Sequence, residues 1–353
     1  MSDLKKNIRN KKDRIITMLT VVTGVFLIGT IIFSLIYFQK KMNDTEKMLT
    51  KEENKQYGEY YVMIAPDMEA DFKESVYNSA LEEAKSNNIF LQLLEEDLDE
   101  DYSKTELLKI AINTNVDGII VEGDESSETS ELILKATQRG IPVVTVLDDS
   151  VNSGRKSFIG ISKYNLGRAY ASGLCDYVRK NKMEQCNALV LLDNDQSISN
   201  QSTLASAINE KIDEEELSDI INIDSLLINN DSDFEAEEEI RDLFVGNERL
   251  PDVIVCLNET NTICVMQTVI DYNYVGRVGI IGNYISDSIS DAIVRGVIDS
   301  TLVIDSDQMG KQSVEALHEY NESGYVSEIY VIDEDIINSI NIDSVAGGGS
   351  AHE

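Results

Sequence analysis

Short apolar runs alternate with longer amphipathic segments along the chain from about residue 60. Runs of four to six residues rich in Val and Ile predict buried strands, and apolar residues at three- and four-residue steps predict helices. The expected strands are 60–64, 89–94, 118–121, 143–147, 158–159, 188–192, 220–227, 253–257, 278–281, 302–304 and 329–332. The expected helices are 71–85, 105–112, 127–139, 162–180, 201–213, 234–244, 260–272, 287–295 and 307–320.

This alternation predicts an α/β fold with parallel sheets that are buried on both faces. Roughly ten strand–helix units are too many for one comfortable sheet. A chain of 353 residues also favours two domains. We therefore expect two doubly wound lobes.

The segment before this pattern has a different character. Residues 15–38 carry no charge and no proline, and basic residues precede them. As a helix this run would span about 36 Å, which is enough to cross a bilayer. A cleaved signal peptide is the alternative. However, the C-terminal end of the run, Leu35–Lys41, consists of bulky and basic residues and lacks a small-residue cleavage site.

We therefore expect a cytoplasmic segment at 1–14, a transmembrane anchor from Ile15 to Phe38 and a stalk at 39–56. The basic residues before the anchor place the N-terminus in the cytoplasm and the rest of the chain outside it, as a single-pass protein of the cell membrane. The end of the chain, residues 346–353, is rich in Gly and is expected to be a flexible tail.

Acidic residues dominate the expected exported part. The whole chain has 30 Lys and Arg against 64 Asp and Glu; residues 1–41 hold 8 and 2 of these, which leaves 22 against 62, or about −40. Such a charge repels nucleic acid, so we expect no nucleic-acid partner. The four cysteines show no CxxC spacing and are expected to be buried thiols rather than a disulfide framework.

Few residues are available for catalysis. The only histidines are His318 and His352, and no glycine-rich phosphate-binding motif follows a predicted strand. A histidine-based triad or zinc site is therefore excluded. We expect no enzyme activity, no cofactor and no metal site.

Ligands of doubly wound sheets bind outside the carboxyl ends of the strands. The positions to inspect are 66–72, 122–124, 148–149, 194–201, 258, 283–284 and 305. Among them, the candidate ligand-binding residues are Phe72, Asp148, Asp149, Gln201, Asn258, Asn283, Tyr284 and Asp305. Carboxylates and amides beside an aromatic face suit sugars and small polyols. The alternative for each single residue is a helix cap or a turn former.

Five segments resemble motifs of one family. They are Ile141–Asp149 (IPVVTVLDD), Phe158–Arg168 (FIGISKYNLGR), Pro251–Glu259 (PDVIVCLNE), Val278–Asn283 (VGIIGN) and Asp307–Gly310 (DQMG). Because these segments occur in this order and spacing, the chain resembles the type 1 periplasmic binding proteins, the ribose- and galactose-binding class of bacterial solute-binding proteins. The resemblance implies two Rossmann-like lobes joined by a three-stranded hinge, with the ligand clamped between them.

The resemblance also implies boundaries and contacts. The solute-binding domain would cover 57–345, with a first lobe of about 57–160 and 305–324 and a second of about 161–304 and 325–345. Asn258 would contact the sugar, Phe72 would stack on it, and Asp148 or Asp149 would be the acid. Ser162, which we expect to cap a helix, and Lys163 replace an acid–amide pair of the family; Gly167 is expected to let that helix pack closely.

The function implied is that of a membrane-anchored extracytoplasmic protein that closes on a small polar ligand, a sugar or sugar derivative. Its partner would be an ABC permease for uptake or a sensor histidine kinase for signalling. A ligand-free interaction module that kept the fold and lost the pocket is the alternative.

Overall fold

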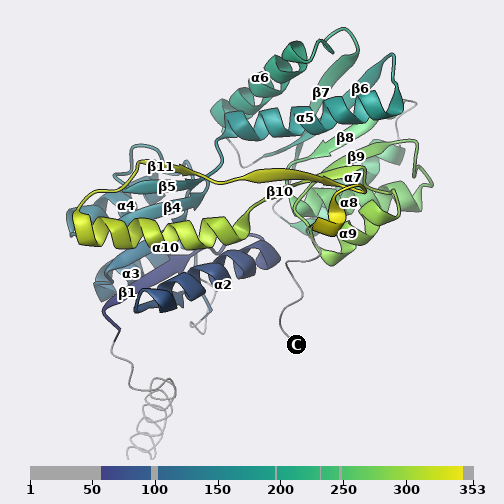
Figure 1. Cartoon of the computed structure of the whole chain (residues 1–353). Helices are drawn as coiled ribbons and strands as arrows, with labels where there is room; N and C mark the ends of the chain where they lie inside the picture. Colours follow the sequence, from purple (N-terminus) through teal and green to yellow (C-terminus); the bar gives the residue numbers. More distant parts are fainter. Residues whose placement is uncertain (1–56, 97–101, 195–196, 231, 246–248, 345–353) are drawn as a thin grey trace, which may run out of the picture. The chain divides into compact units, whose positions relative to one another are not determined.

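The computed structural model describes residues 57–96, 102–194, 197–230, 232–245 and 249–344 (Figure 1). The predicted cytoplasmic segment, anchor, stalk and tail lie outside these residues. No helix within the described ranges is long and apolar enough to cross a membrane. The fold described below is that of the compact unit that begins at Gly58.

The first lobe is built on a six-stranded parallel sheet of order β11-β5-β4-β3-β1-β2. Its elements are β1 (Glu59–Ile64), α2 (Ala70–Ser86), β2 (Ile89–Leu93), α3 (Lys104–Thr114), β3 (Gly118–Glu122), α4 (Ser127–Gln138), β4 (Val143–Leu147), β5 (Ser157–Gly160), α10 (Ser306–Ser323) and β11 (Ile329–Val331). Every residue of β3 is buried, as expected for a central strand covered on both faces.

The second lobe has a six-stranded sheet of order β12-β10-β9-β8-β6-β7, in which only β12 runs antiparallel to its neighbour. Its elements are α5 (Lys163–Asn181), β6 (Cys186–Asp193), α6 (Ile198–Glu214), β7 (Ile221–Ile228), α7 (Asp233–Val245), β8 (Val253–Cys256), α8 (Glu259–Asp271), β9 (Gly279–Asn283), α9 (Asp287–Val294), β10 (Ser300–Ile304), β12 (Glu334–Asn338) and the 3-10 turn Ile342–Ser344.

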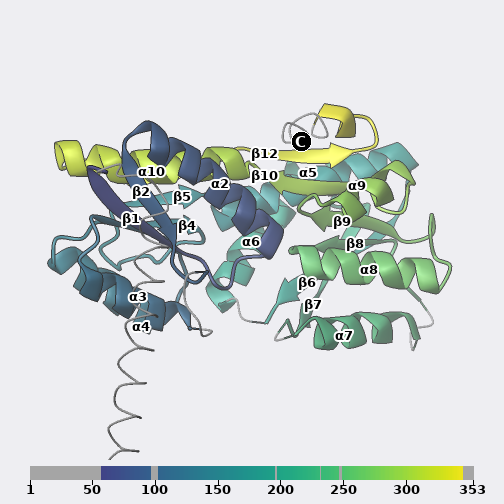
Figure 2. The same ribbon diagram turned by 90° about the horizontal axis from the view of Figure 1, so that it is seen from below.

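Helices cover both faces of each sheet. In the first lobe, α2 and α10 lie side by side on one face, and α3 and α4 cover the other (Figure 2). In the second lobe, α5 and α6 cover one face, and α7, α8 and α9 cover the other. Each face has its own cluster of buried apolar side chains. The predicted doubly wound α/β fold is therefore confirmed.

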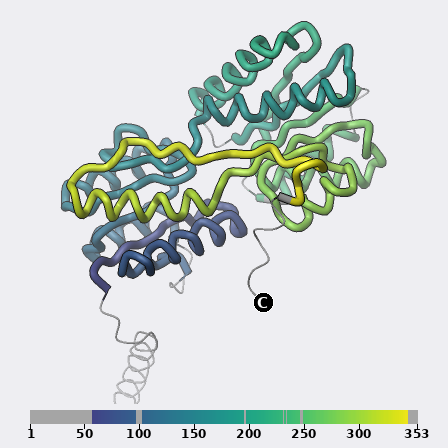
Figure 3. The backbone as a smooth tube through the Cα atoms, in the orientation of Figure 1, coloured from purple at the N-terminus to yellow at the C-terminus, as the bar shows by residue number. Residues whose placement is uncertain are grey.

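Three segments connect the lobes: the ones that lead from β5 to α5, from β10 to α10 and from β11 to β12 (Figure 3). Backbone hydrogen bonds join them, from Asp305 N to Asp333 O at 3.0 Å and from Ile332 N to Gly160 O at 3.1 Å. The predicted boundary needs one correction. The resemblance predicts that 325–345 belong to the second lobe, but β11 pairs with β5 in the first sheet, and the chain enters the second sheet only at β12.

The opening of α5 follows its sequence signals. The Ser162 hydroxyl caps the helix by accepting a hydrogen bond from the backbone N–H of Asn165 at 3.1 Å. A Cβ on Gly167 would lie 2.6 Å from the carbonyl oxygen of Leu204 on α6. The predicted cap and the predicted close approach are both confirmed. Cys175, Cys186 and Cys256 are buried thiols, as predicted, and Cys264 is half-buried.

Candidate functional site

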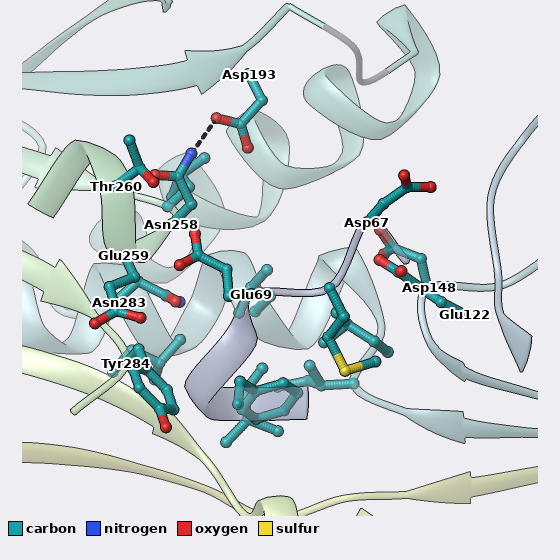
Figure 4. Close-up of a pocket in the computed structure, with 18 of the residues that line it drawn as sticks. Asp67, Glu69, Glu122, Asp148, Asp193, Asn258, Glu259, Thr260, Asn283 and Tyr284 are labelled. Carbon is teal, nitrogen blue, oxygen red and sulfur yellow. Dashed lines mark hydrogen bonds between the residues drawn. The ribbon is translucent and has the colours of Figure 1, made fainter. Parts of the chain in front are cut away.

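A pocket of about 580 Å³ is lined by residues of both lobes at the carboxyl ends of the strands (Figure 4). This volume is in the usual range for small-molecule sites. The first lobe contributes Asp67, Met68, Glu69, Phe72, Glu122, Leu147 and Asp148. The second lobe and the connecting segments contribute Ile161, Lys163, Leu166, Asp193, Leu204, Asn230, Leu257, Asn258, Glu259, Thr260, Asn283, Tyr284, Leu302 and Ile304.

A tight turn after β4 presents Asp148 to the pocket. Leu147 has a φ of 65°, a left-handed conformation that bulky side chains rarely adopt. The turn is closed by a hydrogen bond from Asp148 N to Val146 O of 2.8 Å. One carboxylate oxygen of Asp148 then lies 2.6 Å from Nζ of Lys163, the first residue of α5. This ion pair links an acid of the first lobe to the second lobe.

A pair of aromatic rings forms an apolar contact between the lobes. Phe72 of α2 and Tyr284, just after β9, meet edge to face with their ring centroids 5.8 Å apart. Tyr284 also has a left-handed φ, of 67°, and two hydrogen bonds hold its backbone: its N–H donates to Leu302 O at 2.8 Å and its carbonyl accepts from the Thr301 hydroxyl at 2.6 Å. Non-glycine residues in this conformation are concentrated at binding sites.

Asp193, at the end of β6, is the centre of an amide cluster in the second lobe. Its Oδ1 accepts from the side-chain amides of Asn230 and Asn258 at 2.6 Å each and of Asn261 at 3.4 Å. The other end of the Asn258 side chain caps α8 by accepting from Asn261 N at 2.7 Å. The cluster therefore fixes the orientation of Asn258 toward the pocket.

Two buried carboxyl groups in the pocket have raised pKa values. Burial raises the pKa of Glu122 to about 7, although the positive charge of Lys104 opposes the shift. Burial also raises the pKa of Glu259. Hydrogen bonding with Ser286 and with Glu69 lowers this pKa and offsets the rise in part. The pKa of Tyr284 rises to about 12 for the same main reason, with the negative charge of Glu259 adding to the effect.

Comparison with known proteins identifies the family. Residues 61–323 match the family described as a periplasmic binding protein domain. The chain belongs to this family. It is a family of binding proteins and not of enzymes, which confirms the expectation that the chain is not an enzyme and the resemblance seen in the sequence. No curated protein matches the chain.

Solved structures share the fold of this periplasmic binding protein. A glucose–galactose binding protein, GanP, from Geobacillus stearothermophilus has a TM-score of 0.69 and 19% identity over 81% of this chain and 99% of its own. A solute-binding protein from Actinobacillus succinogenes with bound D-allose has a TM-score of 0.67 and 18% identity over 81% and 99%. The structure described as a XylFII–LytSN complex has a TM-score of 0.65 and 23% identity over 80% and 98%.

Five of the eight candidate ligand-binding residues line the pocket of this binding protein: Phe72, Asp148, Asn258, Asn283 and Tyr284. Their contact with a ligand stays a prediction. Two hydrogen bonds hold Asn283: its side-chain amide donates to the Tyr170 hydroxyl at 2.7 Å, and its backbone N–H donates to the Thr262 hydroxyl oxygen at 2.9 Å.

The other three candidates do not line the pocket. Asp149 points back into the first lobe, where it forms a two-point ion pair with Arg155, with Nη2–Oδ2 at 2.6 Å. Gln201 donates to the carbonyl of Asp193 at 3.3 Å from within α6. Asp305 caps α10 by accepting from Gln308 N at 2.8 Å. Asp305 is therefore a helix cap, the role that its residue type offers as the alternative to ligand binding.

Sequence reasoning did not select Glu69, Glu122, Lys163, Asp193 or Glu259 as ligand-binding residues, although all five line the pocket. Glu69 and Glu122 fall within the strand-end positions marked for inspection. Asp193 and Glu259 each lie one residue outside a marked position, and Asp193 was placed beyond the end of its strand. Strand ends extended by one residue on each side find these four acids, whereas Lys163 is found only as the residue that replaces part of the family's acid–amide pair.

Proposed function

We propose that this chain is a membrane-anchored, extracytoplasmic receptor whose two lobes close on a small polar ligand, a sugar or sugar derivative. The observation that carries the proposal is the pocket shared by both lobes, with acids, amides and an aromatic pair at the strand ends. Family membership supports it, as do structural neighbours described as binding glucose and galactose, D-allose or D-arabinose.

Closure provides the signal in this proposal. The Asp148–Lys163 ion pair and the Phe72–Tyr284 ring contact both join the lobes, so they stabilise the lobe arrangement of this structure. A ligand that bridges the same surfaces adds its binding free energy to that arrangement and shifts the population of lobe positions toward it. Backbone connections at three points leave the lobes able to rotate about the hinge.

A sensor histidine kinase is the partner that we favour over an ABC permease. A permanent anchor at Ile15–Phe38 would keep the receptor beside a membrane kinase. The structural neighbour described as a XylFII–LytSN complex pairs a protein of this fold with a second protein, whereas others are described as parts of ABC transporters.

Calorimetry of the full chain in detergent against a panel of neutral and amino-bearing pentoses and hexoses tests the proposal. We expect saturable binding of at least one sugar and a higher midpoint of thermal unfolding in its presence. Asn258→Ala should weaken that binding because the substitution removes an amide from the pocket wall. No heat and no thermal shift with any sugar would overturn the proposal.

One observation favours the alternative of a ligand-free interaction module. The amide of Asn258 and the carboxylates of Asp193 and Asp148 already have protein partners in this structure. A ligand-free module predicts that Asn258→Ala and Asp148→Ala leave partner signalling intact, whereas substitutions on the lobe surfaces abolish it. A ligand-free module would also bind none of the sugars in the calorimetry panel, so the panel and these variants together separate the two functions.

A further inference from the structure

Acidic side chains dominate the charged residues that line the pocket. Six carboxyl groups and a single lysine, Lys163, are among its lining residues; the acids are Asp67, Glu69, Glu122, Asp148, Asp193 and Glu259. Protein groups compensate three of them: Lys163 pairs with Asp148, Lys104 pairs with Asp67, and side-chain amides surround Asp193. Of the remaining acids, Glu122 and Glu259 form no ion pair with a lysine or arginine of the described residues.

Glu122 is the most informative of these acids. It ends β3 with only 8% of its surface exposed, and its Oε2 has no hydrogen-bond partner among the described residues. Lys104, the cation that acts on Glu122, makes its short contacts with Asp67 at 3.0 Å and Asp124 at 3.2 Å instead. A buried carboxylate without a donor is unfavourable, so this position is suited to a donor that arrives with the ligand.

Charges around Glu122 reinforce this requirement. Asp67, Asp148 and Asp124 all act to raise its pKa, together with burial, and only Lys104 acts in the opposite direction. A cation placed in the pocket would reverse the balance and favour the ionised carboxylate. A neutral ligand would leave the negative charges facing one another.

A second pair of acids meets across the pocket. Glu69 precedes α2 in the first lobe, Glu259 begins α8 in the second, and the two side chains face each other in Figure 4. Two ionised carboxylates in this arrangement would repel each other, and burial already raises the pKa of Glu259. A cationic ligand between them would favour the ionised form of both.

The pocket also has an unused acceptor in the second lobe. Oδ1 of Asn230 is buried and has no hydrogen-bond partner in the described structure. The lining thus calls for a ligand rich in donors as well as positive charge. A metal ion fits less well, because no group of three or more His, Cys, Asp or Glu within the described ranges is placed to hold one.

We propose that the ligand is a polyhydroxylated amine of the amino-sugar class, with its ammonium group bound by Glu122. This inference rests on the proposed function of a sugar receptor and specifies its ligand. The ammonium donates to Oε2 of Glu122, and the hydroxyl groups donate to acceptors such as Oδ1 of Asn230. Glu69 and Glu259 add negative potential on the opposite wall.

Calorimetry with matched sugars separates the two proposals. The full chain in detergent is titrated with glucosamine, N-acetylglucosamine and glucose, and with the corresponding galactose series; within each series the ring is the same and only the charge-bearing group changes. We expect an amine to bind at least about tenfold more tightly than its neutral counterparts. Equal or tighter binding of the neutral sugars overturns this inference and leaves the receptor function standing. If no sugar binds, the receptor function fails, and this inference fails with it.

Glu122→Gln tests the residue itself, because it keeps the shape of the side chain and removes its charge. The variant should lose about tenfold or more in affinity for the amine and change little for a neutral sugar. Glu125→Gln is the matched control, since Glu125 is exposed on the same loop and does not line the pocket. If Glu122→Gln retains the preference for the amine, the assignment is wrong.

Proton release provides a measurement that needs no variant. Titrations at pH 6, where the sugar amine is already protonated, in buffers with different ionisation enthalpies report the protons released on binding. We expect the wild-type chain to release protons when an amine binds, because the ammonium ionises Glu122, which is still protonated at this pH. Binding of the amine without any proton release would contradict a role for this carboxyl.

Discussion

Two glycines on α5 differ in what a side chain would meet, and this difference makes a sharp prediction about the second lobe. A Cβ on Gly167 would lie 2.6 Å from Leu204 O and 2.9 Å from the Cβ of Ala207, so α5 and α6 approach each other through this position. A Cβ on Gly173 would meet its nearest neighbour, a methyl group of Ile281, at 3.6 Å, an ordinary contact.

The magnitudes follow from these distances. Replacing a helical glycine with alanine adds about 1 kcal/mol of stability through helix propensity at both positions. At Gly167 the new methyl group must displace backbone atoms of α6, which costs about 1–3 kcal/mol. Gly173→Ala should therefore stabilise the lobe by up to about 1 kcal/mol, whereas Gly167→Ala should be less stable than Gly173→Ala by about 1–3 kcal/mol, because the propensity gain cancels in the comparison.

Thermal unfolding of the full chain measures the difference. The chain contains no tryptophan, so circular dichroism or calorimetry is more suitable than intrinsic tryptophan fluorescence. With about 2–4 °C per kcal/mol for a domain of 150–250 residues, the two midpoints should differ by several degrees. If Gly167→Ala melts at or above the temperature of Gly173→Ala, then the close approach of α5 and α6 does not constrain the lobe as argued.

Two further predictions concern acids at the strand ends. Burial raises the pKa of Glu122 from 4.5 to about 7, so the folded chain holds a proton that the unfolded chain releases, and stability falls as the pH rises through this window. Between pH 5 and pH 8, the free energy of unfolding measured with denaturant should fall by about 2–4 kcal/mol more in the wild-type chain than in Glu122→Gln. The same pH dependence in both proteins would contradict the shift. Asp149→Asn should destabilise the fold by about 1–3 kcal/mol through loss of the Arg155 pair and spare sugar affinity, whereas Asp148→Asn should lower affinity about tenfold with little effect on stability. The reverse pattern, measured by calorimetry and thermal unfolding, would refute the assignment of these neighbours.

Much of the fold was predictable because local signals agree with the final packing. The alternation of apolar runs and amphipathic segments predicted the strand and helix order, and Ser162 and Gly167 had the roles that their residue types indicated. β12 was not predicted. It follows β11 after two residues, and its move to the other sheet depends on pairing with β10, which no local pattern records.

The candidate site was predictable only in part for a related reason. Strand ends locate the pocket, but the direction of each side chain depends on tertiary partners. Asp148 and Asp149 are adjacent in sequence, and a left-handed Leu147 presents the first to the pocket while Arg155 holds the second in the lobe. The surroundings of Glu122 likewise depend on charges from other segments, Lys104, Asp67 and Asp148, which the sequence of one strand does not encode.

The connections between the lobes bear on how the chain is made. Nearly all of the second lobe is one continuous stretch from α5 to β10, whereas the core of the first lobe needs Met309, Val314 and Leu317 of α10, and its sheet needs β11. During synthesis from the N-terminus, the first lobe therefore leaves the ribosome early but lacks a helix that covers one of its faces. We expect the second lobe to complete its core first, and the first lobe to remain dependent on the last part of the chain, with apolar surface open to chaperones until α10 arrives.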